Sequence, residues 1–289
     1  MFHQSQIKKI LINHNIKPRK RLGQNFLIDK NINDKILKYI NATKDDIIIE
    51  IGAGFGNLTI PLAQCAYRVY AIEKDKRIAE VLKENLSNFD NAYVIIDDFL
   101  KVELREILKN KSLKNIKVVG NLPYYISSPV MFRLMNYRNK ISSAIFIFQK
   151  EVAERLIATP HSRNYGILSC LINLYAETHK ITNISKNSFY PKPQVDSSLI
   201  KLEFLPKPRF KIDNNDVFVK VVKAAFSKRR KYILNALSTY YNLKLDKKLA
   251  SSLLDKLDID YKTRAEDIYP ENYAKLSNLV SKTEDRIKD

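Results

Sequence analysis

The chain has 289 residues, 45% of them hydrophobic, so it can bury a large core and exceeds one typical domain. Its 50 Lys and Arg against 31 Asp and Glu give a formal net charge of +19, which favours a polyanionic partner, with nucleic acid preferred over an anionic membrane surface. No apolar run is long enough for a membrane-spanning helix or a signal peptide, so we expect a soluble, cytoplasmic protein with no membrane partner.

The N-terminal arm, residues 1–28, carries six basic side chains and no acidic one. A segment of this composition cannot fold alone, so we expect it to lie against an acidic or phosphate-rich surface. A solvated tail is the alternative interpretation.

A Gly-rich turn at residues 52–56 follows a β-branched run at 47–51 and precedes a helical apolar pattern. This order is typical of a nucleotide-binding strand-turn-helix, in which glycines let the backbone approach a ligand. The next apolar segment, 68–73, ends in Glu73, 21 residues after Gly52, where a carboxylate suits a ribose. Dinucleotide and S-adenosylmethionine enzymes share this pattern, so it does not choose between them.

Five apolar segments, ending near residues 51, 73, 96, 120 and 148, alternate with helix-compatible stretches. This βα alternation predicts an α/β fold with a parallel, doubly wound, Rossmann-like sheet. The third segment runs into Asp97-Asp98 and the fourth into a polar motif, which would place cofactor and target along one sheet edge. Methyl transfer is favoured by this arrangement.

The motif after the fourth segment is Asn121-Leu122-Pro123-Tyr124. The Asn121 side-chain oxygen and the Leu122 carbonyl, held at a fixed angle by Pro123, form two acceptors aimed at one point. Such a pair suits the exocyclic amine of a planar base, on which Tyr124 can stack. A plain strand-to-turn transition is the alternative for these four residues alone.

The last third of the chain changes character. Residues 199–204 alternate apolar with charged side chains and predict a strand near the sheet edge, after which Pro206 and Pro208 break the pattern. From about residue 212 only helical periodicities occur, which predicts a small all-helical domain. We therefore expect three regions, namely the arm 1–28, a Rossmann-like domain 29–206 and a helical domain 207–289.

Three further features bear on the chemistry. The two cysteines, Cys65 and Cys170, lie far apart in apolar segments and are expected to be free thiols, and the four histidines lack ligand spacing, so we expect no metal site. A basic cluster, Lys228-Arg229-Arg230-Lys231, is either a solvated helix face or a set of phosphate contacts on structured RNA, and we favour RNA. Phe226 just before it can anchor the cluster on a core.

Taken in order, these motifs resemble the ribosomal RNA adenine N6,N6-dimethyltransferase family, most closely its bacterial small-subunit (16S rRNA) branch. The resemblance runs from about Lys20 to about Tyr273. It is carried by Arg21–Leu27, Glu50–Gly54, Glu73, Asp98, Asn121–Tyr124, Gln149–Val152, Phe189–Ser197 and Ala225–Lys231. Tyr125 stands where the family often has Asn, and Lys228 where it often has Gln; both neighbour key residues without replacing them.

The resemblance implies S-adenosylmethionine as cofactor. It also implies that the arm 1–28 closes over the cofactor, that 29–206 is the methyltransferase domain and that 207–289 is the rRNA-binding domain, and it assigns roles to the site residues. Gln24, Asn25 and Leu27 would close over the cofactor, Gly52 would lie beneath its amino-acid moiety, Glu73 would take the ribose and Asp98 the adenine amine. The full implied cofactor-binding set is Gln24, Asn25, Leu27, Gly52, Gly54, Glu73, Asp98 and Asn121, and the implied catalytic set is Asn121, Leu122, Pro123, Tyr124 and Phe189.

In the target site, Tyr124 and Phe189 would sandwich a flipped base. Phe189 could instead be an ordinary core aromatic, and Tyr190 could equally be the ring that stacks. The implied partners of the chain, expected to be a monomer, are small-subunit rRNA and the pre-assembled small ribosomal subunit.

Two alternatives stay open at this point. One is a large-subunit rRNA methyltransferase that confers antibiotic resistance, and the other is a non-catalytic RNA-binding or ribosome-assembly role. The intact glycine turn, Glu73, Asp98 and Asn121 argue against loss of catalysis, and the long helical C-terminal segment favours the small-subunit branch.

Overall fold

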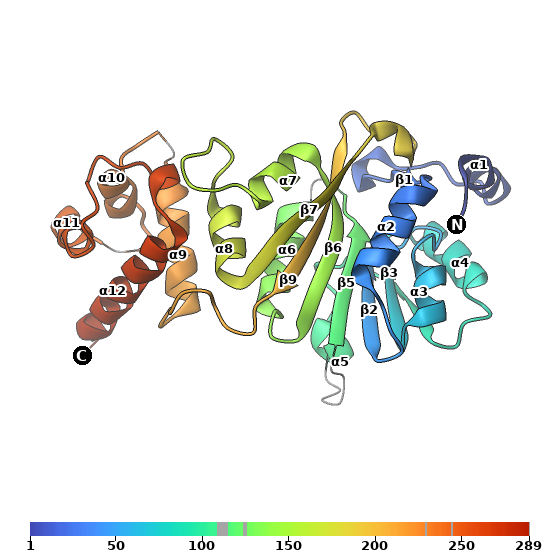
Figure 1. The fold of residues 1–289 in the computed structure, drawn as a ribbon, viewed down its shortest axis with the longest axis horizontal. Helices are drawn as coiled ribbons and strands as arrows, with labels where there is room; N and C mark the ends of the chain where they lie inside the picture. Colours follow the sequence, from blue (N-terminus) through green and yellow to red (C-terminus); the bar gives the residue numbers. More distant parts are fainter. Residues whose placement is uncertain (109–114, 124–125, 229, 244, 289) are drawn as a thin grey trace. The chain divides into compact units, whose positions relative to one another are not determined.

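The computed structural model describes residues 1–289 except 109–114, 124–125, 229, 244 and 289 (Figure 1). The chain forms two compact units. The first comprises Met1–Ala153 with Thr178–Phe204, and the second comprises Glu154–Glu177 with Leu205–Asp289. The helical unit therefore includes a segment from the middle of the sequence as well as the C-terminal region.

A seven-stranded mixed sheet has the order β4-β3-β2-β5-β6-β9-β7. The first five strands of this order, β4, β3, β2, β5 and β6, are mutually parallel, and β9 runs antiparallel to β6. The strands are β2 (Asp46–Ile51), β3 (Arg68–Glu73), β4 (Ala92–Ile96), β5 (Asn115–Asn121), β6 (Ile141–Gln149), β7 (Ala176–Ile184) and β9 (Ser197–Phe204). The predicted Rossmann-like sheet is confirmed, and β9 lies near the edge as expected, next to the edge strand β7.

The central strand β2 shows why an almost continuous apolar run was a reliable signal. All six of its residues are buried, since helices cover both faces of the sheet. Its two acidic residues have partners: Asp46 Oδ2 lies 2.8 Å from Lys117 Nζ on β5, and Glu50 Oε2 accepts a hydrogen bond from the Thr59 hydroxyl at 2.6 Å.

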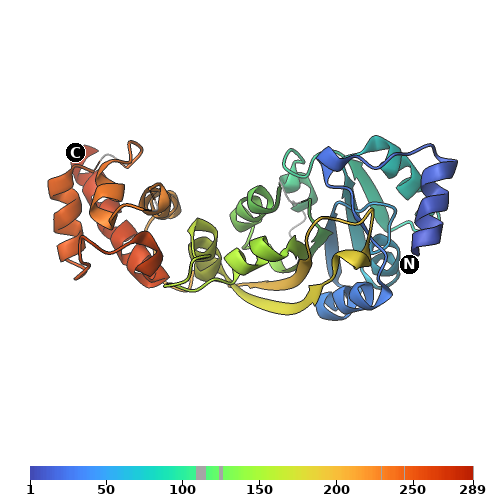
Figure 2. The ribbon, with the colours of Figure 1, turned by 90° about the horizontal axis from the view of Figure 1, so that it is seen from above.

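Helices α2 (Lys30–Ile40) and α3 (Thr59–Cys65) lie on one face of the sheet, and α5 (Leu104–Leu108) and α6 (Ser127–Asn136) lie on the other (Figures 1 and 2). Asp29 caps α2 by accepting hydrogen bonds from the next turn's amides. The apolar side chains of α2 pack with Ile48 and Val119 in one core cluster. This packing fixes α2 over β2 and β5, next to the carboxyl ends of the strands.

The N-terminal arm is ordered and contains helix α1 (Gln4–Asn13) and the short helical turn η1 (Lys20–Leu22). Ile7 and Leu11 of α1 are buried against Phe55 and against α4 (Lys76–Asn85). The attachment of this helix is apolar, so the expected acidic docking surface is not found there, and its lysines are exposed. Further along the arm, Arg19 Nη1 lies 4.0 Å from Asp75 Oδ2, which is an acidic contact of the expected kind.

The strand β1 (Phe26–Leu27) connects the arm to a distant part of the chain. It pairs antiparallel with β8 (Phe189–Tyr190). At the start of the arm, the Phe2 amide donates a hydrogen bond to Asn57 Oδ1 at 2.7 Å. The arm is therefore held both by its apolar face and by polar contacts to the glycine turn.

The second unit is helical, as predicted for the C-terminal region. It contains α8 (Ile167–Tyr175), α9 (Asn215–Phe226), α10 (Ile233–Ser238), α11 (Lys247–Asp255) and α12 (Pro270–Lys288), and α7 (Lys150–Leu156) enters it. The Phe226 ring contacts the rings of Tyr165 and Tyr273, with centroids 5.9 and 6.0 Å apart. Phe226 thus anchors the end of α9 in the core, as expected. In the described part of the chain no helix is long and apolar enough to cross a membrane.

Candidate functional site

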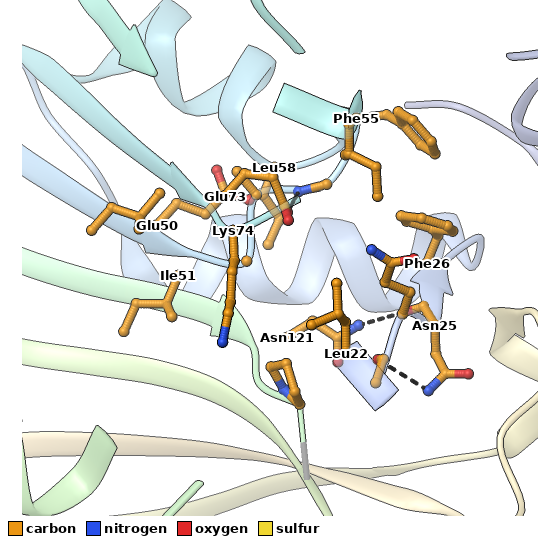
Figure 3. Close-up of a pocket in the computed structure, with 18 of the residues that line it drawn as sticks. Leu22, Asn25, Phe26, Glu50, Ile51, Phe55, Leu58, Glu73, Lys74 and Asn121 are labelled. Carbon is orange, nitrogen blue, oxygen red and sulfur yellow. Dashed lines mark hydrogen bonds between the residues drawn. The ribbon is translucent and has the colours of Figure 1, made fainter. Parts of the chain in front are cut away.

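A pocket opens at the carboxyl ends of β2, β3, β4 and β5 (Figure 3). Its walls come from the arm (Ile7 and residues 22–27), Asn33, the glycine turn and its flanks (50–55, Asn57 and Leu58), the segments 72–74 and 97–99, and Ile78, Asn121, Pro123 and Ile126. The structure therefore brings together all eight residues predicted for the cofactor site: Gln24, Asn25, Leu27, Gly52, Gly54, Glu73, Asp98 and Asn121 line this pocket.

The glycine turn adopts a backbone that other residues rarely take. Gly52 has φ +73° and Gly54 has φ +59°, both in the left-handed region. A Cβ on Gly120 of β5 would lie 2.6 Å from the Ile51 carbonyl oxygen, so β2 and β5 approach each other closely only because Gly120 has no side chain. This close approach places the residue after Gly120, Asn121, beside Gly52.

Glu73 lies at the end of β3 and is 8% exposed. Its Oε2 accepts the Gly54 amide at 3.0 Å and its Oε1 accepts the Asp75 amide at 2.9 Å. Burial raises the pKa of Glu73, and these hydrogen bonds oppose the rise without cancelling it. A carboxylate has about four acceptor positions, and the amides of Gly54, Asp75 and Lys74 use three of them, which leaves about one for a ribose hydroxyl.

Asp98 follows β4 and forms an ion pair that the sequence did not predict. Its Oδ2 lies 2.8 Å from Lys74 Nζ, and its Oδ1 accepts the Leu100 amide at 2.9 Å. Burial acts to raise the pKa of Asp98, but the hydrogen bonds from Lys74 and Leu100 outweigh it and the pKa is lowered. The carboxylate is therefore ionised, with Lys74 beside it at the pocket rim.

Asn121 is oriented by the arm. Its Nδ2 donates to the Asn25 carbonyl oxygen at 2.7 Å, and Asn25 Nδ2 donates in turn to the Gly23 carbonyl oxygen at 3.2 Å (Figure 3). With the amide nitrogen engaged, the Asn121 Oδ1 is left as an acceptor. A Cβ on Gly23 would lie 2.9 Å from Pro123 Cβ, so the arm and the polar motif are in contact.

Two other members of the polar motif differ in how they are placed. The Leu122 side chain is 1% exposed and does not line the pocket; its expected role used only its carbonyl. Tyr124, the expected stacking ring, lies outside the described residues.

Gln24 uses both ends of its amide to fasten the arm. Its Nε2 donates to Asp75 Oδ2 at 2.9 Å, and its Oε1 accepts the Arg19 amide at 2.6 Å. The Arg77 guanidinium also binds Asp75 and, with the Gln24 contact, lowers the pKa of Asp75 to about 2. Gln24 therefore holds the arm at the pocket through its hydrogen bonds to Asp75 and Arg19.

Phe189 and Tyr190 take different positions. Phe189 pairs with Leu27 across the short sheet, is 4% exposed and belongs to a core cluster; it does not line the pocket. Tyr190 packs against the arm, and Lys8 Nζ lies 5.4 Å from its ring centroid. The stacking role of Phe189 stays a prediction.

Several pocket residues were not singled out from the sequence. Phe55 and Phe26 form an aromatic pair with ring centroids 4.6 Å apart (Figure 3), and Asn57 ties the turn to the arm. Glu50 and Asn33 are buried polar residues in the pocket wall, 2% exposed each. Burial raises the pKa of Glu50 to about 8, while the hydrogen bond from Thr59 acts in the opposite direction.

Sequence patterns did contain a signal for Glu50, because a single acid inside a buried strand is unusual. No comparable signal marked Asn33, which occupies an ordinary helical position. Among the described residues, no group of three or more His, Cys, Asp or Glu side chains is placed to hold a metal ion.

The basic cluster lies in the second unit. Helix α9 ends at Phe226, so the cluster occupies the turn before α10 and not a helix face, which corrects the helical interpretation. Lys228, Arg230 and Lys231 are exposed, and Lys228 Nζ donates to Thr239 Oγ1 at 3.0 Å. Arg229 lies outside the described residues.

Comparisons with known proteins find similar rRNA methyltransferases. A family model described as ribosomal RNA adenine dimethylase matches residues 15–282. The ribosomal RNA small subunit methyltransferase A of Syntrophus aciditrophicus is 39% identical over 275 residues, covering 95% of this chain and 98% of the relative. The protein of the same name from Clostridioides difficile is 38% identical, covering 95% and 94%.

Solved structures show the same fold. A dimethyladenosine transferase from Plasmodium falciparum has a TM-score of 0.72 and 29% identity, covering 87% of this chain and 95% of that one. A 23S rRNA methyltransferase, ErmE, has a TM-score of 0.65 and 24% identity, covering 89% and 100%, and at that identity it supports the fold alone.

Proposed function

This chain belongs to the ribosomal RNA adenine dimethylase family, and we propose that it methylates N6 of two adjacent adenosines in the 3′-terminal hairpin of small-subunit (16S) rRNA, giving N6,N6-dimethyladenosine during small-subunit assembly. The observation that carries this proposal is the position of Asn121. Its amide nitrogen is held by the arm, so its free oxygen is fixed in the pocket that also contains Glu73. The names of the relatives support small-subunit rRNA as the substrate.

The pocket fits S-adenosylmethionine, which supplies an electrophilic methyl group when bound. Glu73 would offer its remaining acceptor position to the ribose hydroxyls, and Asp98 is an ionised acceptor for the adenine amine. Gly52 allows close approach of a ligand, because it has no side chain and its φ of +73° is one that other residues rarely take. Leu27, Asn25 and Gln24 would cover the cofactor from the arm side.

Asn121 and the Leu122 carbonyl would orient the target amine by accepting its two N–H protons. This contact localises the lone pair on nitrogen and directs it at the methyl group. Holding the reacting atoms in line can remove up to roughly 7–11 kcal/mol of the barrier in ideal cases. Attack by a neutral amine on a cationic donor spreads charge in the transition state, so a preorganised polar site can act without a general base.

Recognition of rRNA would involve both units. Tyr124 would stack on the flipped base, with Phe189 or Tyr190 as the second ring. The exposed Lys228, Arg230 and Lys231, with their neighbour Arg229, would bind phosphates of the folded RNA. A monomeric protein with these separate contacts is expected to act on the pre-assembled small subunit in the cytoplasm, and better than on naked RNA.

Methylation mapping tests this function. Undermethylated small subunits, large subunits and free rRNA are incubated with the protein and S-adenosylmethionine, and the RNA is digested and analysed by mass spectrometry. We expect dimethyladenosine at two adjacent positions of small-subunit rRNA. Labelling confined to large-subunit rRNA would transfer the assignment to the resistance enzymes, and binding of the cofactor without any labelling would favour a non-catalytic role.

The variant Asn121→Ala tests the proposed mechanism. It should abolish detectable methyl transfer and leave S-adenosylmethionine affinity within a few-fold of wild type, since Asn121 mainly serves the chemical step. Calorimetry beside a tritium-transfer assay measures both quantities. Substantial activity in the variant would contradict the role of Asn121 in orienting the amine.

A further inference from the structure

The wall of the pocket contains a polar side chain that the roles above leave unused, Asn33 of α2. The residue lines the pocket although it is only 2% exposed. Its Oδ1 is buried without a hydrogen-bond partner, and in the described part of the chain no hydrogen bond involves its Nδ2. Folded proteins satisfy nearly all buried amides, so the missing partner of Asn33 is a ligand group or a water molecule.

Asn33 lies on one side of the pocket. Helix α2 packs on Ile48 of β2 and Val119 of β5. Glu73 and Asp98 follow β3 and β4, which lie on the other side of β2 in the sheet. The side chain of Asn33 is therefore remote from the part of the pocket assigned to adenosine and close to the ends of β2 and β5.

The chemistry of that end of the cofactor matches the amide. With its ribose on Glu73, the cofactor extends its amino-acid end toward β2 and β5. This end carries an ammonium, which only donates hydrogen bonds, and a carboxylate, which only accepts them. An Asn amide offers one acceptor and two donors, so it can serve either group whichever way its amide is turned.

We propose that the side-chain amide of Asn33 binds the amino-acid end of S-adenosylmethionine. This inference rests on the proposed function, because it takes the cofactor from there. It gives a reason for the buried amide, since an apolar leucine of similar size would suit a position that is 2% exposed better in the absence of ligand. The cofactor-free protein thus tolerates an unsatisfied group that the cofactor satisfies.

Two ligands that differ only at the relevant end provide the test. S-adenosylhomocysteine keeps the amino-acid end and is not turned over, whereas 5′-methylthioadenosine lacks that end. Both are titrated calorimetrically into wild type, Asn33→Leu and Asn33→Ala, with Asn31→Ala as the control because Asn31 is exposed on the same helix. Circular dichroism verifies the fold, and the alanine variant serves if the leucine variant does not fold.

We expect Asn33→Leu to weaken S-adenosylhomocysteine binding by about 10-fold or more, the range for a hydrogen bond to a charged group. Its affinity for 5′-methylthioadenosine should stay within about two-fold by the same reasoning, and the melting temperature of the cofactor-free variant should rise. The control variant Asn31→Ala should leave both ligand affinities and the melting temperature unchanged.

Other outcomes separate the alternatives. An equal loss of affinity for both ligands would make Asn33 a structural residue. If neither affinity falls, a raised Michaelis constant for RNA would show that Asn33 faces the target base, and an unchanged constant would show that it faces water. Each result overturns the inference while the proposed function stands. Failure of the wild-type protein to bind S-adenosylhomocysteine would instead overturn the proposed function itself.

Discussion

Glu50→Gln should make the protein more stable, and increasingly so as pH rises. Glu50 lies in the middle of the sheet, 2% exposed, and its Oε2 accepts a hydrogen bond from Thr59 at 2.6 Å. Burial raises the pKa of Glu50 from 4.5 to about 8. Glutamine keeps the shape and the acceptor for Thr59 but cannot ionise.

The sign follows from proton counting. Between pH 4.5 and about 8 the folded protein keeps the Glu50 proton and the unfolded chain loses it, so the contribution of this group to stability falls as pH rises. The loss is about 1.4 kcal/mol per pH unit, or roughly 5 kcal/mol across the whole window as an upper limit. Below pH 4.5 both states are protonated and the two proteins should have similar stability.

Urea unfolding of the cofactor-free proteins at several pH values from 5 to 9 measures the effect. The stability difference between Glu50→Gln and wild type should grow by several kcal/mol from pH 5 to 8 and then level off. Glu103→Gln, at an exposed position, is the matched control and should show no such growth. A difference that stays flat over this range would mean that Glu50 ionises freely, through water reaching it in the pocket.

Two further changes test the arm and the second unit. Gly23 has a φ of +63°, and a Cβ in Gly23→Ala would lie 2.9 Å from Pro123 Cβ. The variant should therefore lose about 1–2 kcal/mol of stability, measured by thermal unfolding, and should transfer methyl groups more slowly because the arm is displaced. Unchanged activity would show that the arm contact is dispensable. Lys228→Glu with Arg230→Glu should weaken binding to small subunits and reduce the slope of log K against log salt by nearly one per lost phosphate contact, at unchanged cofactor affinity. An unaltered slope would make the basic cluster a solvated surface.

The sequence predicted the sheet and its active edge because the signals were local. A run such as Ile47–Ile51 is apolar at nearly every position, as a strand buried on both faces must be, and the next residues are glycines. Parallel strands end at one edge, so Glu73, Asp98 and Asn121 had to lie near one another once the strands were recognised. Their proximity needed no knowledge of side-chain packing.

Positions that depend on packing between distant segments were less predictable. The arm was judged by its charge, yet Ile7 and Leu11 dock it, because two or three apolar contacts outweigh solvated lysines. The strand β7 escaped notice because an exposed edge strand alternates weakly and contains charged residues. The burial of Phe189 could not be predicted either, because it depends on pairing with Leu27, 162 positions earlier in the chain.

The burial of Asn33 and Glu50 could not be predicted from a hydrophobic pattern either, because both are polar residues at buried positions. Both are polar residues that a hydrophobic pattern would have excluded, Asn33 from the buried face of α2 and Glu50 from β2. Local propensity and burial disagree at these two positions, and both lie in the wall of one pocket. Natural proteins accept such conflicts chiefly where a ligand compensates them. A polar residue at a core position, once the fold is known, therefore points to a binding site. The pH series measures the cost of such a residue in the cofactor-free protein, and the ligand titrations of the Asn33 variants measure how much of that cost a bound cofactor analogue recovers.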